Sequence, residues 1–288
     1  MIYVSNFKAG SVTVFAPTAR DNAAPVRTIA GARTGLSGPL GLAIDAHELL
    51  YVANRTGAGV TVHGPRAHGD VAPVRTLRVP ATAEALAVAV GPDGDAFVAT
   101  VPRAGAAGCP PAIVHFPPRA TGSDYTIAGP LTGLTCPVGL AFHPSGRLYV
   151  ANALGGVVSA FAADAIGNAS PLQSFTAATS STRAIACGAG MLLLTGPGVY
   201  LYPSAGTPAN GPAAVFGPSS SFSLRYAGGI AIDAHTQAPI IYVADYAVGA
   251  LHVIETVGVP PHLAVAKASA IKGAATSLDG PVGVLCTP

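Results

Sequence analysis

The chain has 288 residues, of which half are hydrophobic and only 10% are charged, and its formal net charge is +2 at pH 7. A chain this apolar can bury a large core, which excludes intrinsic disorder. The 15 lysines and arginines are scattered along the chain and form no basic stripe of the kind that binds nucleic acid. No apolar stretch approaches the ~18 residues of a membrane-spanning helix, so we expect neither a nucleic-acid partner nor a membrane span.

Glycine and proline are abundant, with 35 and 26 residues. They recur between short apolar runs, which is the pattern of an all-β chain with many turns. All-β folds of this length often form one domain. We predict a single domain over residues 1–288.

One strand pattern recurs six times: an apolar residue, an aromatic residue, Val-Ala and a short polar residue. In chain order the copies are residues 2–6, 50–54, 96–100, 148–152, the degenerate 192–195, and 241–245. Their central residues, Tyr3, Tyr51, Phe97, Tyr149, Leu193 and Tyr242, lie 44 to 52 residues apart. Self-similarity at such a period indicates a repeat architecture.

Each copy is preceded by an apolar run rich in small residues and followed by two more strands. The preceding runs are residues 41–45, 87–90, 139–142, 184–187, 229–233 and 283–286, and residues 12–15 and 25–29 are examples of the following strands. Each unit is thus an antiparallel sheet of four strands, which we call inner, second, third and outer in chain order. One such sheet cannot bury its own faces, whereas radial stacking buries them. We predict a six-bladed β-propeller.

The chain begins with a second strand and ends with an inner strand. We therefore expect residues 283–287 to pair with the strand that contains Tyr3 and Val4, which would close the ring. The tyrosines that centre the second strands, Tyr3, Tyr51, Tyr149 and Tyr242, should be buried between blades with a partner for each hydroxyl.

These strings resemble the NHL-repeat family, whose units combine a Gly-Ile-Ala-Val-Asp strand, a Tyr-Val-Ala-Asp/Asn strand and an alternating third strand. The resemblance covers essentially the whole chain, with degenerate units at Phe97 and Leu193. It is specific for the fold and implies little about activity. Related six-bladed propellers include lactonases of the gluconolactonase type, the streptogramin B lyase, and protein- or carbohydrate-binding modules.

The resemblance places functional residues on one face, where the second-to-third loops and the outer-to-inner loops open around the axis. We call this the mouth face. The last residues of the second strands should line it, namely Asn6, Asn54, Thr100, Asn152, Thr195 and Asp245. The outer-to-inner loops add Glu84, Arg183, Arg225, Tyr226 and Asp279.

Two interpretations of the repeated Asn and Asp residues remain open. In the first, Asn54, Glu84, Asn152 and Asp245 converge on Ca²⁺ or another divalent cation on the axis, comparable to the Glu/Asn/Asp set of gluconolactonase-type enzymes. In the second, which the repetition favours, each Asn or Asp hydrogen-bonds to the backbone of a turn. A divalent cation is the only cofactor implied.

Basic residues form a second candidate feature of the mouth. Lys8, Arg55 and Arg103 fall in second-to-third loops, and Arg183 and Arg225 fall in outer-to-inner loops. Together they predict a positive mouth for an anionic ligand, against the alternative of separate solvated charges. The predicted ligand-binding set is Asn6, Asn54, Glu84, Arg103, Asn152, Arg183, Arg225, Tyr226 and Asp245.

The sequence contains no metal-binding histidine spacing, no Gly-x-Ser-x-Gly motif and no P-loop. The leading hypothesis is a monomeric propeller that binds a small ligand or a protein at the mouth. The alternative is a divalent-metal-assisted lactonase or lyase. A structural or adhesive module is a third hypothesis, which no specific residue favours.

The four cysteines lead to a prediction about the compartment. Cys109 and Cys136 fall in neighbouring loops of the mouth face, and we predict a disulfide between them. Cys187 and Cys286 occupy the same position of two inner strands and should be free, buried thiols. A disulfide indicates an oxidising compartment. We therefore expect a secreted or periplasmic protein from which a signal was removed and to which a start Met was added; the alternative is a cytoplasmic protein with four reduced cysteines.

Overall fold

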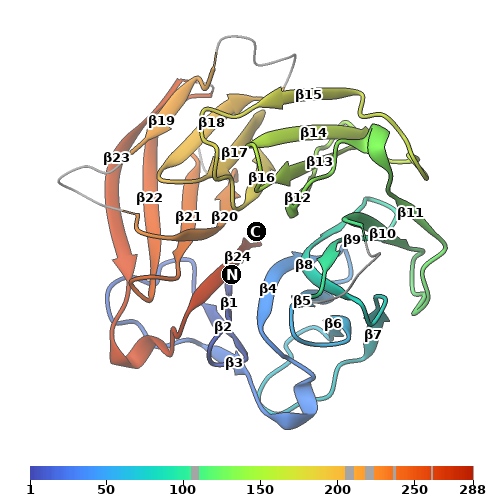
Figure 1. Cartoon of the computed structure of the whole chain (residues 1–288). Helices are drawn as coiled ribbons and strands as arrows, with labels where there is room; N and C mark the ends of the chain where they lie inside the picture. The colour runs from blue at the N-terminus through green and yellow to red at the C-terminus, as the bar shows by residue number, and fades with distance from the viewer. Residues whose placement is uncertain (105–109, 205–210, 218–223, 236–237, 261, 288) are drawn as a thin grey trace.

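The computed structural model describes residues 1–104, 110–204, 211–217, 224–235, 238–260 and 262–287. In these residues the strands form six four-stranded antiparallel sheets, arranged as blades around an axis (Figure 1). The protein is a six-bladed β-propeller, as the repeat predicts. We number the blades 1 to 6 in chain order, and blade 1 contains the N-terminus.

The strands occupy equivalent places in the six blades. The inner strands are β4 (Pro39–Ile44), β8 (Ala83–Val90), β12 (Pro137–Phe142), β16 (Ile185–Gly188), β20 (Ala227–Asp233) and β24 (Pro281–Cys286). The second strands are β1 (Ile2–Asn6), β5 (Leu50–Asn54), β9 (Ala96–Pro102), β13 (Arg147–Asn152), β17 (Met191–Thr195) and β21 (Ile240–Asp245). The third strands are β2 (Ser11–Phe15), β6 (Gly59–His63), β10 (Ala112–Phe116), β14 (Val157–Ala162), β18 (Val199–Pro203) and β22 (Ala250–Val259). The outer strands are β3 (Arg27–Ile29), β7 (Arg75–Arg78), β11 (Tyr125–Ile127), β15 (Gln173–Thr176), β19 (Ala214–Phe216) and β23 (His262–Ile271).

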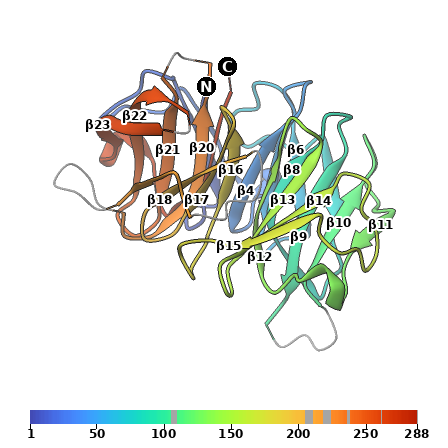
Figure 2. The ribbon, with the colours of Figure 1, turned by 90° about the horizontal axis from the view of Figure 1, so that it is seen from above.

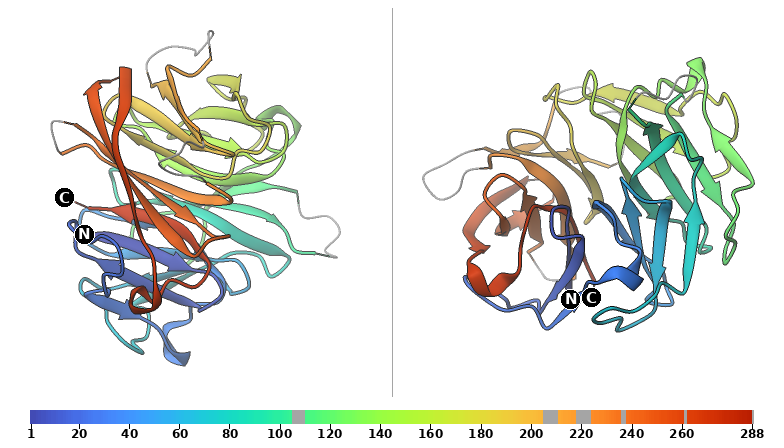
Figure 3. Two further views of the ribbon diagram at one scale, coloured as in Figure 1. Left: turned by 90° about the vertical axis from the view of Figure 1, so that its left-hand side faces the viewer. Right: turned by 60° about the horizontal axis from the view of Figure 1, so that its bottom comes forward.

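The ring closes by pairing the two ends of the chain. Strand β24 pairs antiparallel with β1, with Leu285 opposite Tyr3 and Val284 opposite Val4. The backbone N–H of Thr287 donates to the carbonyl oxygen of Met1 at 2.9 Å. The two termini accordingly lie side by side (Figure 2 and Figure 3). The predicted closure by residues 283–287 is confirmed.

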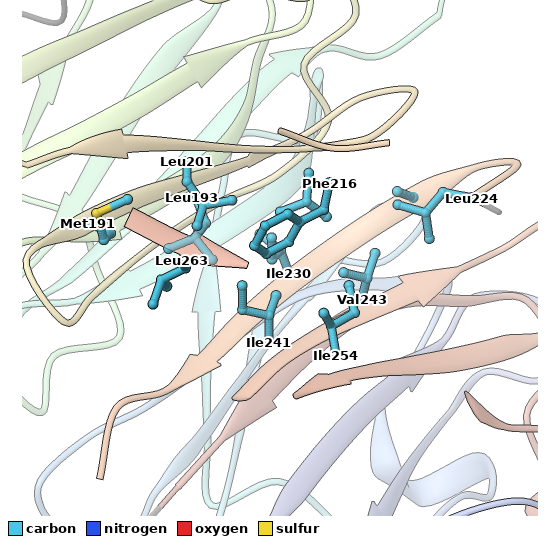
Figure 4. Close-up of a cluster of buried hydrophobic side chains, with 12 residues drawn as sticks. Met191, Leu193, Leu201, Phe216, Leu224, Ile230, Ile241, Val243, Ile254 and Leu263 are labelled. Atoms are coloured by element: carbon cyan, nitrogen blue, oxygen red, sulfur yellow. The ribbon is translucent and has the colours of Figure 1, made fainter. Parts of the chain in front are cut away.

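Apolar side chains between adjacent blades form the core. Leu193 and Leu201 of blade 5 belong to one buried cluster with Ile230, Ile241 and Val243 of blade 6 (Figure 4). Burying a side chain of this kind stabilises a fold by roughly 1.5–3 kcal/mol. Because each blade has two such faces, stacking around the ring accounts for most of the buried apolar surface.

The tyrosines that centre the second strands are buried, as expected. The Tyr51 hydroxyl donates to Asp45 at 3.1 Å and accepts from Arg75 at 2.7 Å. The hydroxyls of Tyr3 and Tyr149 pair with Arg27 and with the carbonyl of Ser204. Burial raises the pKa of the fourth hydroxyl, that of Tyr242, to about 12, and a partner for this hydroxyl stays a prediction.

Adjacent inner strands approach so closely that they require glycine. A Cβ atom on Gly283 would collide with the carbonyl oxygen of Leu40 in the next blade. The Ser5 hydroxyl fits into this contact, because it accepts from the Gly283 N–H at 2.8 Å and donates to the Leu40 carbonyl at 2.5 Å. The small residues that open the inner strands therefore set how tightly the blades close around the axis.

Three outer-to-inner loops share a motif, Gly-x-x-Thr-x-Leu, around the short 3-10 helices η1 (Ala32–Thr34), η2 (Pro130–Thr132) and η3 (Ala274–Thr276). The threonine hydroxyl donates to the glycine carbonyl in each. A carboxylate or amide oxygen from the third-to-outer loop of the following blade accepts a backbone N–H of the same turn; these residues are Asp70, Asn168 and Asn22. We call these three the motif loops, and they lead into blades 2, 4 and 1.

Candidate functional site

A cavity of about 350 Å³ lies on the propeller axis. It is lined by residues of all six inner strands, from the strand beginnings to near their middles, including Leu42, Val88, Leu140, Ile230 and Val284. Inner strands begin at the mouth face, so the cavity lies at that end of the axis. Its volume is at the lower end of the range for small-molecule sites.

One residue from each blade forms a ring around this cavity. In five inner strands the pairing with the second strand skips a residue: Asn152 pairs with Pro137 and Ala151 with Gly139, which leaves Val138 between them as a β-bulge. Bulges re-aim side chains and often occur beside functional sites. The five bulge residues and their equivalent in blade 5 all line the cavity: Leu40, Leu86, Val138, Arg183, Gly228 and Val282. We call these six residues the ring.

Arg183 is the only charged member of the ring. Its guanidinium carbon lies 3.7 Å from the centre of the Tyr226 ring, within the range of a cation–π contact. Tyr226 is 42% exposed, lines the cavity, and contacts Tyr246 with ring centres 5.6 Å apart. The Lys8 ammonium lies 4.8 Å from the Tyr246 ring centre. Aromatic rings and cations thus run from the cavity across blades 5, 6 and 1.

The opposite side of the rim holds an ion pair. Arg55 Nε and Glu84 Oε2 are 2.8 Å apart, and both residues line the cavity. Cys136 and Thr182 also line it. Burial raises the pKa of the Cys136 thiol, and the nearby Arg55 guanidinium opposes this shift. The Thr182 hydroxyl is buried and has no hydrogen-bond partner among the described residues.

The residues that end the second strands lie elsewhere. Asn6, Asn54, Asn152 and Asp245 are almost completely buried, and none of them lines the cavity. The side-chain oxygens of Asn54 and Asn152 accept the backbone N–H groups of Ser37 and Thr135 at 2.9 and 3.0 Å. Each of these amide side chains therefore closes a motif loop.

Asp245 makes the same kind of contact with two oxygens. It accepts N–H groups from Arg225 at 2.7 Å and from Tyr226 at 2.9 Å, and another from Ala247. Burial by itself raises the pKa of Asp245, but the nearby His252, whose Nε2 lies 3.7 Å from the carboxylate, and these three backbone donors outweigh it, so the net pKa is below the usual value. Asp245 thereby holds the loop that presents Tyr226.

A divalent cation does not fit the four residues proposed as its ligands. Glu84 lines the cavity and is paired with Arg55, whereas Asn54, Asn152 and Asp245 direct their oxygens to backbone donors outside the cavity. A hard cation needs several oxygen ligands that converge on one point. These four side chains do not provide such a point.

Some of the remaining predicted ligand-binding residues line the cavity, and the others lie in the surrounding loops. Arg183 and Tyr226 reach the cavity, as does Glu84. Arg225 is exposed beside it, and Arg103 donates to the carbonyls of Ala81 and Ala83 at 3.2 and 3.3 Å. Asn6 accepts the Asp279 N–H at 3.3 Å. The structure thus brings three of the nine predicted ligand-binding residues to the cavity.

The sequence analysis missed the ring and Thr182. The signal was present, because Arg183 directly precedes the inner run of blade 5, where the other blades have Leu40, Leu86, Val138, Gly228 or Val282. Comparing this position across the six repeats would have identified Arg183 as a departure from an apolar pattern.

The cysteine prediction is tested only in part. Cys136, Cys187 and Cys286 are free thiols in the structure, and Cys109 lies outside the described residues. Burial raises the pKa of Cys187, and it raises the pKa of Cys286 to about 12. The Cys109–Cys136 disulfide stays a prediction.

Within the described part of the chain, no helix is long and apolar enough to cross a membrane.

Comparison with known proteins supports the fold. No family model matches the chain, and no curated protein matches it in sequence. A putative oxidoreductase (glucose dehydrogenase) from Thermus thermophilus is 16% identical, with a TM-score of 0.60 over 89% of this chain and 90% of that one. A putative 6-phosphogluconolactonase from Bacteroides fragilis is 18% identical, with a TM-score of 0.57 over 99% and 83%. The periplasmic gluconolactonase of Pseudomonas aeruginosa is 17% identical, with a TM-score of 0.55 over 91% and 75%. The chain shares its propeller fold with these proteins, and the NHL assignment stays a prediction.

Proposed function

We propose that this propeller binds a small molecule in its axial cavity, entered from the mouth face. The observation that carries the proposal is the contrast within the cavity lining. Apolar side chains of the inner strands form the wall, and the polar residues Arg55, Glu84, Thr182, Arg183 and Tyr226 gather at the mouth end. An apolar pocket with a few convergent polar groups is the usual form of a small-molecule site.

The alternative, a divalent-metal-assisted lactonase or lyase, has weaker support. Two of the structurally similar proteins are named as lactonases, but identities of 17 and 18% support only the fold. Of the four proposed metal ligands, Glu84 alone lines the cavity. Titration with Ca²⁺ in a calorimeter separates the two functions, because the ligand-binding proposal expects no stoichiometric Ca²⁺ binding at the axis.

The cavity can be tested with a neutral apolar fluorophore, N-phenyl-1-naphthylamine. We expect its fluorescence to rise when it binds to the wild-type protein, and Val138→Phe, which places a larger side chain in the ring, to weaken binding at least fivefold. Val26→Phe is the matched control, because Val26 is 53% exposed and does not line the cavity. Equal probe binding by both variants, or none by the wild type, would contradict the proposal.

Three further predictions accompany this function. The first is that the protein is a monomer, which light scattering would show as a single species at the monomer mass. The predicted Cys109–Cys136 disulfide and the predicted export belong together. Peptide mapping without reductant tests the disulfide, since a Cys136 peptide that alkylates freely would exclude it.

A further inference from the structure

We infer that the ligand of the axial cavity is a small organic anion with an apolar body, whose carboxylate or phosphate head binds Arg183. This inference rests on the proposed function and names its ligand class. The head would lie at the mouth end of the cavity, and the body would lie below it among the inner strands.

The position of Arg183 is the first argument. The other five ring residues are Leu40, Leu86, Val138, Gly228 and Val282. The repeat thus places an apolar or small residue at this position in each of the five blades other than blade 5. The chain departs from this pattern once, with a side chain that is charged at all physiological pH values. A charge placed among apolar ring residues loses solvation, and a bound anion would compensate for that loss.

The second argument is the orientation of the guanidinium. The Arg183 guanidinium carbon lies 3.7 Å from the centre of the Tyr226 ring, and a guanidinium that stacks on an aromatic ring keeps its edge for hydrogen bonds. That edge matches two oxygens of a carboxylate or phosphate. Tyr226 is itself fixed, because Asp245 accepts its backbone N–H at 2.9 Å. The backbone that carries the Tyr226 ring is therefore positioned before a ligand binds.

The third argument is charge balance. Among the described residues, Arg183 has no carboxylate within ion-pair distance, and the same holds for its rim neighbours Lys8 and Arg225. Arg55, across the cavity, is neutralised by Glu84. On the side of blades 5, 6 and 1, the cations Lys8, Arg183 and Arg225 outnumber the carboxylates Asp245 and Asp279, and this excess of positive charge attracts an anion to that side.

The fourth argument is the hydroxyl next to Arg183. Thr182 is 0% exposed and lines the cavity, and its Oγ1 has no hydrogen-bond partner among the described residues. Buried polar groups are normally paired, so each exception needs an explanation. An oxygen of the anion bound at Arg183 is a suitable acceptor for this hydroxyl.

The wall below the rim determines the chemistry of the body. The side chains there are Leu, Val, Ile, Ala and Gly, and every polar lining residue lies at the mouth end. A polyhydroxylated sugar would leave hydroxyls facing apolar side chains, at a cost in desolvation. An aliphatic or aromatic body fits this wall better, which separates the inferred ligand from the sugar lactones that some structurally similar proteins are named for.

Calorimetric titration with four probes tests the inference. Octanoate and octyl phosphate carry the two anionic heads, octan-1-ol is the neutral analogue, and gluconate is the hydrophilic anion. We expect at least one of the two anionic amphiphiles to bind the wild type at least tenfold more tightly than octan-1-ol and than gluconate. The comparison of octanoate with octyl phosphate shows which head the site prefers.

Arg183→Leu restores the apolar ring and should abolish the preference for an anion while leaving octan-1-ol binding and the melting temperature unchanged. Arg78→Leu, an exposed residue of the outer strand β7, removes the same charge and should retain wild-type affinity. If neither octanoate nor octyl phosphate binds more tightly than octan-1-ol, or if gluconate binds more tightly than both, the inference is overturned while N-phenyl-1-naphthylamine still reports a working cavity. If that fluorophore also fails to bind, the proposed function fails with it.

Discussion

The mouth face carries two kinds of outer-to-inner loop. The motif loops, which lead into blades 1, 2 and 4, use their polar groups internally: the threonine binds the glycine carbonyl, and Asn6, Asn54 or Asn152 accepts the N–H after the motif leucine. The loops into blades 3, 5 and 6 lack the motif. Those loops are followed by Glu84, Arg183 and Tyr226, which line the cavity.

This difference shows how a repeat protein separates stability from binding. Residues that recur in every well-matched blade make the contacts that every blade needs, so their hydrogen-bonding capacity is used by the backbone. Residues that depart from the repeat do not make these backbone hydrogen bonds, so their polar groups can contact a ligand. Candidate sites in this propeller are therefore better sought among the exceptions to the repeat than among its members.

The largest expected effect comes from two neighbouring residues of β24. In Gly283→Leu, the new side chain would meet the Leu40 carbonyl oxygen, and we expect a loss of about 3 kcal/mol or more in the free energy of unfolding. Val282→Leu changes a ring residue that lines the cavity. It should alter the free energy of unfolding by less than about 1 kcal/mol. Urea denaturation measures both, and equal destabilisation would contradict the division between packing and cavity positions.

A smaller effect is expected for the buried aspartate that holds the Tyr226 loop. Asp245→Ala leaves three backbone N–H groups without their acceptor, which should cost about 2–3 kcal/mol at pH 7. Because the folded pKa of Asp245 is lowered, its stabilising contribution is present above the unfolded value of about 4 and is lost as pH falls further.

The control for this pH dependence is Asn152→Ala, which removes an uncharged acceptor from the equivalent position of blade 4. Unfolding free energies measured between pH 7 and pH 2.5 should converge for wild type and Asp245→Ala below pH 4, but not for wild type and Asn152→Ala. A constant difference for Asp245→Ala would mean that its ionised carboxylate is not what stabilises the loop.

The fold was predictable because it depends on repeated local patterns. The spacing of Tyr3, Tyr51 and Tyr149 identified the blades, and the inner run at residues 283–286 identified the closure. The site was less predictable, because the direction of a side chain at the end of a strand depends on neighbouring loops. Asn54 and Asn152 are predicted from their strand position to line the mouth, yet their side-chain oxygens accept backbone N–H groups of the motif loops.

The bulges could not be predicted from the same patterns. A bulge residue such as Val138 does not alter the repeated sequence pattern. Only the strand register, with Asn152 opposite Pro137 and Ala151 opposite Gly139, reveals the bulge. The bulge is nevertheless what brings one side chain per blade to the cavity. Arg183 was singled out for its charge, whereas its membership of a ring required the structure.

A small effect is expected at the rim ion pair. Glu84→Gln removes the carboxylate that neutralises Arg55 at 2.8 Å. Since Arg55 is half exposed, the stability should change by less than about 1 kcal/mol, while affinity for octanoate should rise two- to fivefold because the rim becomes more positive. The gain should shrink in 0.5 M NaCl, which screens exposed charges. Unchanged or weaker octanoate binding would show that Arg55 and Glu84 lie outside the field of the bound anion.

The central claim is that repeated residues hold the fold and exceptions bind the ligand. The most direct test measures melting temperature and octanoate affinity together for Asn152→Ala and Arg183→Leu. The account predicts that Asn152→Ala loses about 1–3 kcal/mol of stability with octanoate affinity within twofold of wild type. It predicts that Arg183→Leu keeps the wild-type melting temperature and loses at least tenfold in octanoate affinity. If Asn152→Ala weakens octanoate binding in the folded protein, or Arg183→Leu unfolds the blade without affecting affinity, the claim is wrong.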